Sequence, residues 1–111
     1  MFYKSVIGQQ MVKTLDYYYL GKTTAETLET VATFELDGMY LFTCIFAIDG
    51  TAGGVEDADM RAGDVRVLEY PFTQEFGRTL TGIAETGTFQ VKQKYRDACD
   101  YAIHLRFTKL T

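Results

Sequence analysis

The 111-residue sequence contains no tryptophan, one proline, one histidine and one serine. Ser5 lies outside any Gly-x-Ser-x-Gly motif, and His104 has no serine or cysteine partner at a spacing typical of hydrolases. A pair of carboxylates for acid and base catalysis depends on tertiary geometry, which no local pattern supplies. The sequence therefore shows no catalytic motif, and we expect the chain not to be an enzyme.

Cysteine is also scarce, because Cys44 and Cys99 are the only two in the chain. They are far apart and form no Cys-x-x-Cys motif, and with a single histidine in the chain the sequence predicts no zinc site. Cys44 lies within a hydrophobic run, which favours two reduced thiols that act as small apolar side chains. A disulfide between the two remains an open alternative.

Long apolar runs and basic stripes are missing too. No run of about 18 apolar residues occurs, and the first residues lack the basic and apolar segments of a signal peptide, so we expect no membrane insertion. Fifteen acidic residues against eleven basic ones give a net charge of −4. The basic residues are scattered along the sequence, which argues against nucleic-acid binding.

Tyrosine and phenylalanine are abundant instead, with eight of each. These residues favour strands, and apolar and polar positions alternate between recurring glycines. The pattern predicts a single all-β domain over residues 1–111, an antiparallel sandwich of about eight strands. The predicted strands cover residues 2–7, 10–19, 27–36, 39–48, 64–70, 78–84, 88–95 and 101–110. A short helix that begins with a capping box is the alternative for residues 23–32.

The clearest pattern lies in residues 32–48. Asp37-Gly38 separates two runs of aromatic and branched residues, which predicts a two-residue hairpin turn with Gly38 at positive φ. In the second run, alternation places Tyr40, Phe42, Cys44, Phe46 and Ile48 on one face and Met39, Leu41, Thr43, Ile45 and Ala47 on the other. Neither face suits water, so we expect the core on one side and another copy of the chain on the other.

Residues 49–64 are predicted to form the longest loop, which is rich in glycine and acidic residues. Asp49, Glu56, Asp57 and Asp59 supply the hard oxygen ligands that calcium prefers. Their spacing matches no EF-hand, so a solvated acidic loop is the alternative interpretation. Calcium is the only cofactor that the sequence suggests.

Three consecutive tyrosines, Tyr17, Tyr18 and Tyr19, cannot all face one core, because neighbouring side chains of a strand alternate. At least one ring must meet solvent, a partner subunit or a ligand such as a sugar ring. We predict a subunit interface that contains Tyr17 and Tyr19 together with Met39, Leu41 and Ile45. Edge packing and ligand binding are the alternatives for the tyrosines.

Three segments together resemble one known family. Phe34, Gly38, Tyr40 and Phe42 resemble a signature in the globular heads of the complement-component and tumour-necrosis-factor-like superfamily. Residues 80–91 are similar to a strand, turn and strand of that family, and residues 103–110 to its last apolar strand. The resemblance implies an eight-stranded jelly roll with neighbouring first and last strands, and a compact homotrimer. Similar jelly rolls serve as head-decoration and tail-appendage domains of bacteriophages, so a virion setting is suspected.

The sequence favours two functions. The first is a non-enzymatic structural or adhesion module, a trimeric virion decoration or tail-appendage domain that contacts other virion proteins or surface glycans. The alternative is a calcium-assisted carbohydrate-binding module, which rests on the tyrosines and the acidic loop. A fold of this kind does not decide between them, because function depends on the surfaces that the fold presents.

Overall fold

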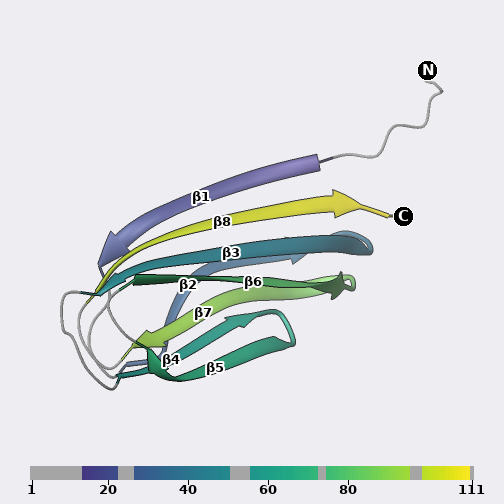
Figure 1. The fold of residues 1–111 in the computed structure, drawn as a ribbon. Coiled ribbons are helices and arrows are strands. Elements are labelled where there is room, and N and C mark those ends of the chain that lie inside the picture. Colours follow the sequence, from purple (N-terminus) through teal and green to yellow (C-terminus); the bar gives the residue numbers. More distant parts are fainter. Residues whose placement is uncertain (1–13, 23–26, 51–55, 73–74, 96–98, 111) are drawn as a thin grey trace.

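Eight antiparallel strands in two four-stranded sheets make up the part of the chain that the computed structural model describes (Figure 1). That part comprises residues 14–22, 27–50, 56–72, 75–95 and 99–110, without the side chains of residues 49, 50, 56, 57, 69–72, 75, 76 and 99. The strands are β1 (Thr14–Lys22), β2 (Glu29–Leu36), β3 (Tyr40–Gly50), β4 (Glu56–Ala62), β5 (Val65–Phe72), β6 (Glu75–Ala84), β7 (Gly87–Tyr95) and β8 (Cys99–Lys109). Among the described residues, no helix is long and apolar enough to cross a membrane.

The strand order is that of a jelly roll. One sheet has the order β1-β8-β3-β6 and the other the order β2-β7-β4-β5, so the chain changes sheet at every connection except the one between β4 and β5. The first and last described strands are neighbours, with Thr14 opposite Thr108 and Lys22 opposite Asp100. The expected all-β jelly-roll sandwich, including its paired end strands, is confirmed.

The core fills the space between the two sheets. Tyr40, Phe42, Cys44, Phe46 and Ile48 of β3 are all buried, as their alternation predicts. The Cys44 thiol is free and buried, so it acts as a small apolar side chain of this core.

Aromatic rings join the two sheets. The Phe107 ring of β8 makes edge contacts with Phe34 of β2 and Phe89 of β7, at centroid distances of 5.4 and 5.1 Å. Tyr17 of β1 packs against Phe34 at 4.6 Å, so the first strand is attached to the opposite sheet by ring contacts. Such edge-to-face pairs add stability beyond the area that they bury.

The predicted hairpin at Asp37-Gly38 is wrong. β2 lies beside β7 and β3 lies between β8 and β6, so this connection crosses from one sheet to the other. Asp37 accepts a hydrogen bond from the Tyr40 hydroxyl at 2.6 Å and faces Lys109 Nζ at 3.3 Å. The described glycines at positive φ are Gly63 and Gly87, and Gly38 is not one of them. A local turn signal cannot reveal that its two flanking strands belong to different sheets.

The hairpin of this fold lies elsewhere, inside the segment predicted as a loop. Residues 56–62 form β4, which pairs with both β5 and β7, and Gly63 at φ +59° turns the chain into β5. Aspartate is unfavourable in strands, and the core side of β4 carries two alanines and Met60, so the segment lacks an obvious strand pattern. Of the other predictions, strand 2–7 lies outside the described residues, whereas Glu29–Leu36 is a strand rather than a helix.

Candidate functional site

The outer surface of the β1-β8-β3-β6 sheet gathers exposed apolar side chains. Of nine exposed large hydrophobic residues in the described chain, seven lie on or beside this surface. We call the set the outer apolar face: Tyr18, Leu20, Met39, Leu41, Ile45, Ile83 and Leu110. Of the other two, Leu68 lies on β5 of the opposite sheet and Leu28 immediately precedes β2.

Strand pairing brings these side chains into rows. Leu41 lies between Ile83 of β6 and Thr108 of β8, and the Leu110 amide donates a hydrogen bond to the Met39 carbonyl oxygen at 2.8 Å. A second row runs from Ile45 through His104 to Tyr18, across β3, β8 and β1. Because directly opposite side chains on a sheet are in contact, the face is continuous along each row.

The structure separates the predicted interface residues into two groups. Met39, Leu41 and Ile45 are exposed on the outer apolar face. Tyr17 and Tyr19 are half-buried and pack against the core, because they share the inner side of β1 with Leu15. The exposed ring is Tyr18, which is 71% accessible. Asp16 lies on the same outer side of β1 as Tyr18 and Leu20. A charged residue two positions before Tyr18 is the sequence signal that Tyr18 is the outward tyrosine.

A charged cluster crosses the same surface. The Asp16 carboxylate accepts a hydrogen bond from Arg106 Nε at 2.9 Å and lies 2.9 Å from His104 Nε2. Hydrogen bonding to Arg106, and then to His104, lowers the pKa of the Asp16 carboxyl below its ordinary value. The Asp16 carboxylate and the Arg106 guanidinium therefore neutralise each other, so a partner can cover the cluster without burying an unpaired charge.

The pairing of His104 with Asp16 is a partnership that spacing alone does not reveal. A histidine held by a carboxylate can act as a general base for a neighbouring side-chain nucleophile or for a water molecule. Cys44 does not serve, because it points into the core and burial raises the pKa of its thiol to about 12. The contact with Asp16 orients the imidazole ring of His104, which stacks on the Tyr18 ring.

The residues of the predicted calcium loop do not all lie in a loop. Asp59 projects from β4, where it is 4% accessible, and both of its carboxylate oxygens accept hydrogen bonds from Arg61 and Arg66. The side chains of Asp49, Glu56 and Asp57 lie outside the described residues. Among side chains that are described, no group of three or more His, Cys, Asp or Glu residues is placed to hold a metal ion. Calcium binding stays a prediction.

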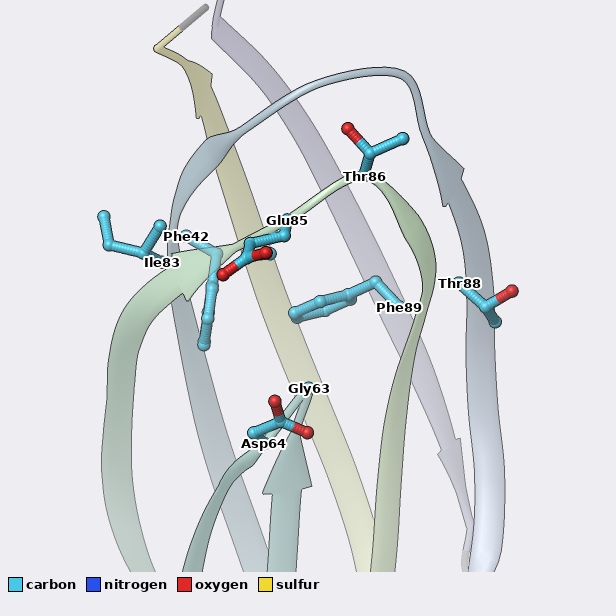
Figure 2. Close-up of a pocket in the computed structure, with 9 residues that line it drawn as sticks. Phe42, Gly63, Asp64, Ile83, Glu85, Thr86, Thr88 and Phe89 are labelled. Atoms are coloured by element: carbon cyan, nitrogen blue, oxygen red, sulfur yellow. The ribbon is translucent and has the colours of Figure 1, made fainter.

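A hollow of about 320 Å³ opens at the end of the sandwich, where the β4–β5 and β6–β7 turns meet. Figure 2 shows the carboxylates of Asp64 and Glu85 on opposite sides of it, with the Phe89 ring between them. Phe89 and Phe42 are almost fully buried, so their rings form the floor and offer little surface to a ligand. A second hollow lies next to this one, because both are lined by Gly63, Asp64 and Thr88.

Comparisons with known proteins do not assign this chain to a family. No protein-family model and no curated protein sequence matches the chain. One solved structure that it resembles belongs to Bacillus endospore appendages, described as a novel family of disulfide-linked pili, with 9% identity, a TM-score of 0.48, and coverage of 91% of this chain and 93% of the other. A likeness at that level assigns neither a family nor a function, and membership of the complement-component and tumour-necrosis-factor-like superfamily stays a prediction.

Proposed function

We propose that this protein is a non-enzymatic structural module that assembles with copies of itself, three around one axis, through the outer apolar face. The observation that carries this proposal is the concentration of seven of nine exposed large hydrophobic side chains on one side of one sheet. Exposed apolar surface of that kind marks an interaction site or makes a monomer prone to aggregation.

The occupant that fits this face best is a second copy of the chain. Asp16 and Arg106 on this face are already paired with each other, and His104 is hydrogen-bonded to Asp16, so the surface needs no complementary charge from its partner. Apolar side chains lie on both sides of that cluster, so a neighbouring copy can cover the face without opposing unpaired charges. In a threefold ring, the outer apolar face of each copy would meet a different surface of the next copy. The threefold arrangement is what the resemblance in residues 34–42, 80–91 and 103–110 implies.

The narrower setting that we propose is a virion decoration or tail-appendage domain with an adhesive surface. The jelly-roll fold supports this only in general terms, because the same architecture serves many functions. In such an assembly, the outer apolar face is buried between copies, while the end of the sandwich in Figure 2 stays accessible to other partners.

Charge substitutions on the two sides of the sandwich test the proposal. Ile45→Asp places a carboxylate on the outer apolar face, whereas Leu68→Asp places the same group at a more exposed site on the other sheet, 64% against 40% accessible. We expect light scattering to give a trimer for Leu68→Asp and a monomer for Ile45→Asp, with circular dichroism showing that both fold.

Leu20→Asp is the second variant on the face, because Leu20 is 84% accessible on β1 and its substitution leaves the core intact. We expect it also to lower the assembly mass. Equal masses for all three variants and the native chain would refute assembly through this face.

A further inference from the structure

The fold gathers four basic residues that are scattered in the sequence. Arg61 of β4 lies opposite Lys92 of β7 and Arg66 of β5, and Lys94 lies opposite Asp59. All four side chains point outward from the β2-β7-β4-β5 sheet, since the alternate residues of β4 and β7 are buried in the core. A chain with a net charge of −4 thus carries a local positive surface.

Asp59 fixes the two arginines of this surface. It accepts hydrogen bonds from Nε and Nη2 of Arg61 at 3.1 and 2.9 Å, and from the same atoms of Arg66 at 3.2 and 2.9 Å. One carboxylate cannot neutralise two guanidinium groups, and the Nη1 atom of each arginine takes no part in these bonds. Asp59 therefore holds both arginines in place, and the Nη1 atom of each can still donate a hydrogen bond to another group.

A hollow of about 220 Å³ lies beside Arg61 and has a mixed lining: Arg61, Gly63, Asp64, Thr88, Gln90 and Lys92. No described residue forms an ion pair with Lys92. The Thr88 hydroxyl donates to Glu35 at 2.8 Å, and Gln90 Nε2 donates to Thr33 Oγ1 at 3.3 Å. Both side chains are thereby oriented, and each retains an oxygen that can accept a hydrogen bond.

We propose that this hollow binds a carboxylate-bearing saccharide. Arg61 and Lys92 supply the positive charge and donors for the carboxylate, while Asp64, Thr88 and Gln90 supply acceptors for sugar hydroxyls. The adjacent hollow of Figure 2, which shares Gly63, Asp64 and Thr88, offers room for a neighbouring sugar unit near Glu85.

A phosphate polymer fits this lining less well. Asp64 lies in the same hollow as the two cations and offers carboxylate oxygens that only a ligand with hydrogen-bond donors can use. The acceptors also need hydrogens to bond, which sugar hydroxyls provide and phosphodiesters do not. The site lies on the sheet opposite the outer apolar face, so the inference does not depend on self-assembly.

Calorimetric titration of the full chain with trigalacturonate tests the proposal. The matched pair is Lys92→Met, inside the hollow, and Lys94→Met, which removes the same charge from the same face of β7 but outside the hollow. We expect Lys92→Met to weaken binding roughly tenfold or more, as loss of a charged hydrogen bond does. Lys94→Met should weaken it less than about threefold, because only screened long-range attraction is lost.

Neutral galactotriose, inorganic phosphate and a short DNA oligonucleotide are the comparison ligands, and light scattering checks that both variants keep the native mass. The proposal predicts much weaker binding of all three. Absence of trigalacturonate binding, or equal losses in the two variants, would overturn it. Phosphate or DNA that binds as tightly as trigalacturonate would identify a general anion surface instead.

Discussion

The Tyr18 ring stacks flat on His104 across the β1–β8 pair, with ring centroids 4.3 Å apart and planes inclined by 11°. The Nε2 atom of the same imidazole lies within hydrogen-bond distance of the Asp16 carboxylate, at 2.9 Å. An exposed tyrosine is thus fixed in one orientation before any partner arrives. Ordering a side chain in advance lowers the entropy cost of burying it in an interface.

Tyr18→Ser should therefore weaken assembly while leaving the fold intact. Because tyrosines at the centre of an interface commonly contribute more than about 1 kcal/mol, we expect the dissociation constant to rise roughly tenfold. Sedimentation over a dilution series measures it. Tyr18→Phe keeps the stacked ring and should assemble as the native chain does; an unchanged dissociation constant for Tyr18→Ser would show that Tyr18 lies outside the interface.

Asp59→Asn should destabilise the sandwich by about 2–3 kcal/mol at pH 7. The substitution leaves Arg61 and Arg66 close together without the carboxylate that both bind, on a buried site of β4. Urea unfolding gives the free-energy difference. Asp64→Asn, at an exposed turn position, is the control and should change stability by less than about 0.5 kcal/mol.

The same carboxyl predicts a pH dependence. Burial raises the pKa of Asp59, but hydrogen bonds from Arg61 and Arg66 outweigh burial and bring it below its ordinary value of 3.8. A carboxyl with a lowered folded-state pKa stabilises the fold above the unfolded value and loses that contribution as pH falls through the folded value. The stability gap between native chain and Asp59→Asn should thus be full at pH 7 and shrink below about pH 3.8. A gap that stays constant down to pH 2 would contradict this assignment.

Gly63→Ala should destabilise by about 1–3 kcal/mol. Gly63 has φ +59°, and an added Cβ would lie 2.7 Å from Cε2 of Phe89, so backbone strain and crowding act together. Gly77→Ala is the matched control, since its Cβ would meet only the Phe46 carbonyl oxygen at an ordinary 3.5 Å. Thermal unfolding of the two variants checks the prediction, which fails if they melt together.

Cys44 should resist alkylation in the native state. Burial raises the pKa of its thiol to about 12, so thiolate is scarce at ordinary pH and the sulfur is also shielded from reagent. In a Cys99→Ser background, iodoacetamide at pH 8 should modify Cys44 only after urea unfolds the chain. The sign of the shift also predicts that stability falls as pH rises from about 9 towards 12, where the unfolded thiol ionises first. Rapid native-state alkylation would place Cys44 outside the core.

The strands with strict alternation were predictable from sequence because one face of each is buried. In β7 and β8, inward apolar residues alternate with polar ones, while in β3 the buried residues from Tyr40 to Ile48 are those that the sequence placed on one face. β4 was not predictable in the same way. Its outward Asp59 is stabilised in the strand by Arg61 and by Arg66 of β5, and the contact with Arg66 depends on the fold.

The surfaces were predicted less completely than the core. Apolar residues on both faces of β3 correctly indicated an exposed apolar surface at Leu41 and Ile45. The basic surface could not be seen in the sequence, because Arg61 and Lys92 lie on strands that become neighbours only when the sheet forms. Likewise, the Asp37-Gly38 turn signal describes local backbone preference and not which sheet each flanking strand joins.

Light scattering of the native chain over a wide concentration range tests self-assembly most directly. We expect a single species of three times the 12.6 kDa chain mass, which dissociates to folded monomer only at the lowest concentrations. A monodisperse monomer that stays soluble at high concentration would contradict it, because the outer apolar face would then be exposed without any partner.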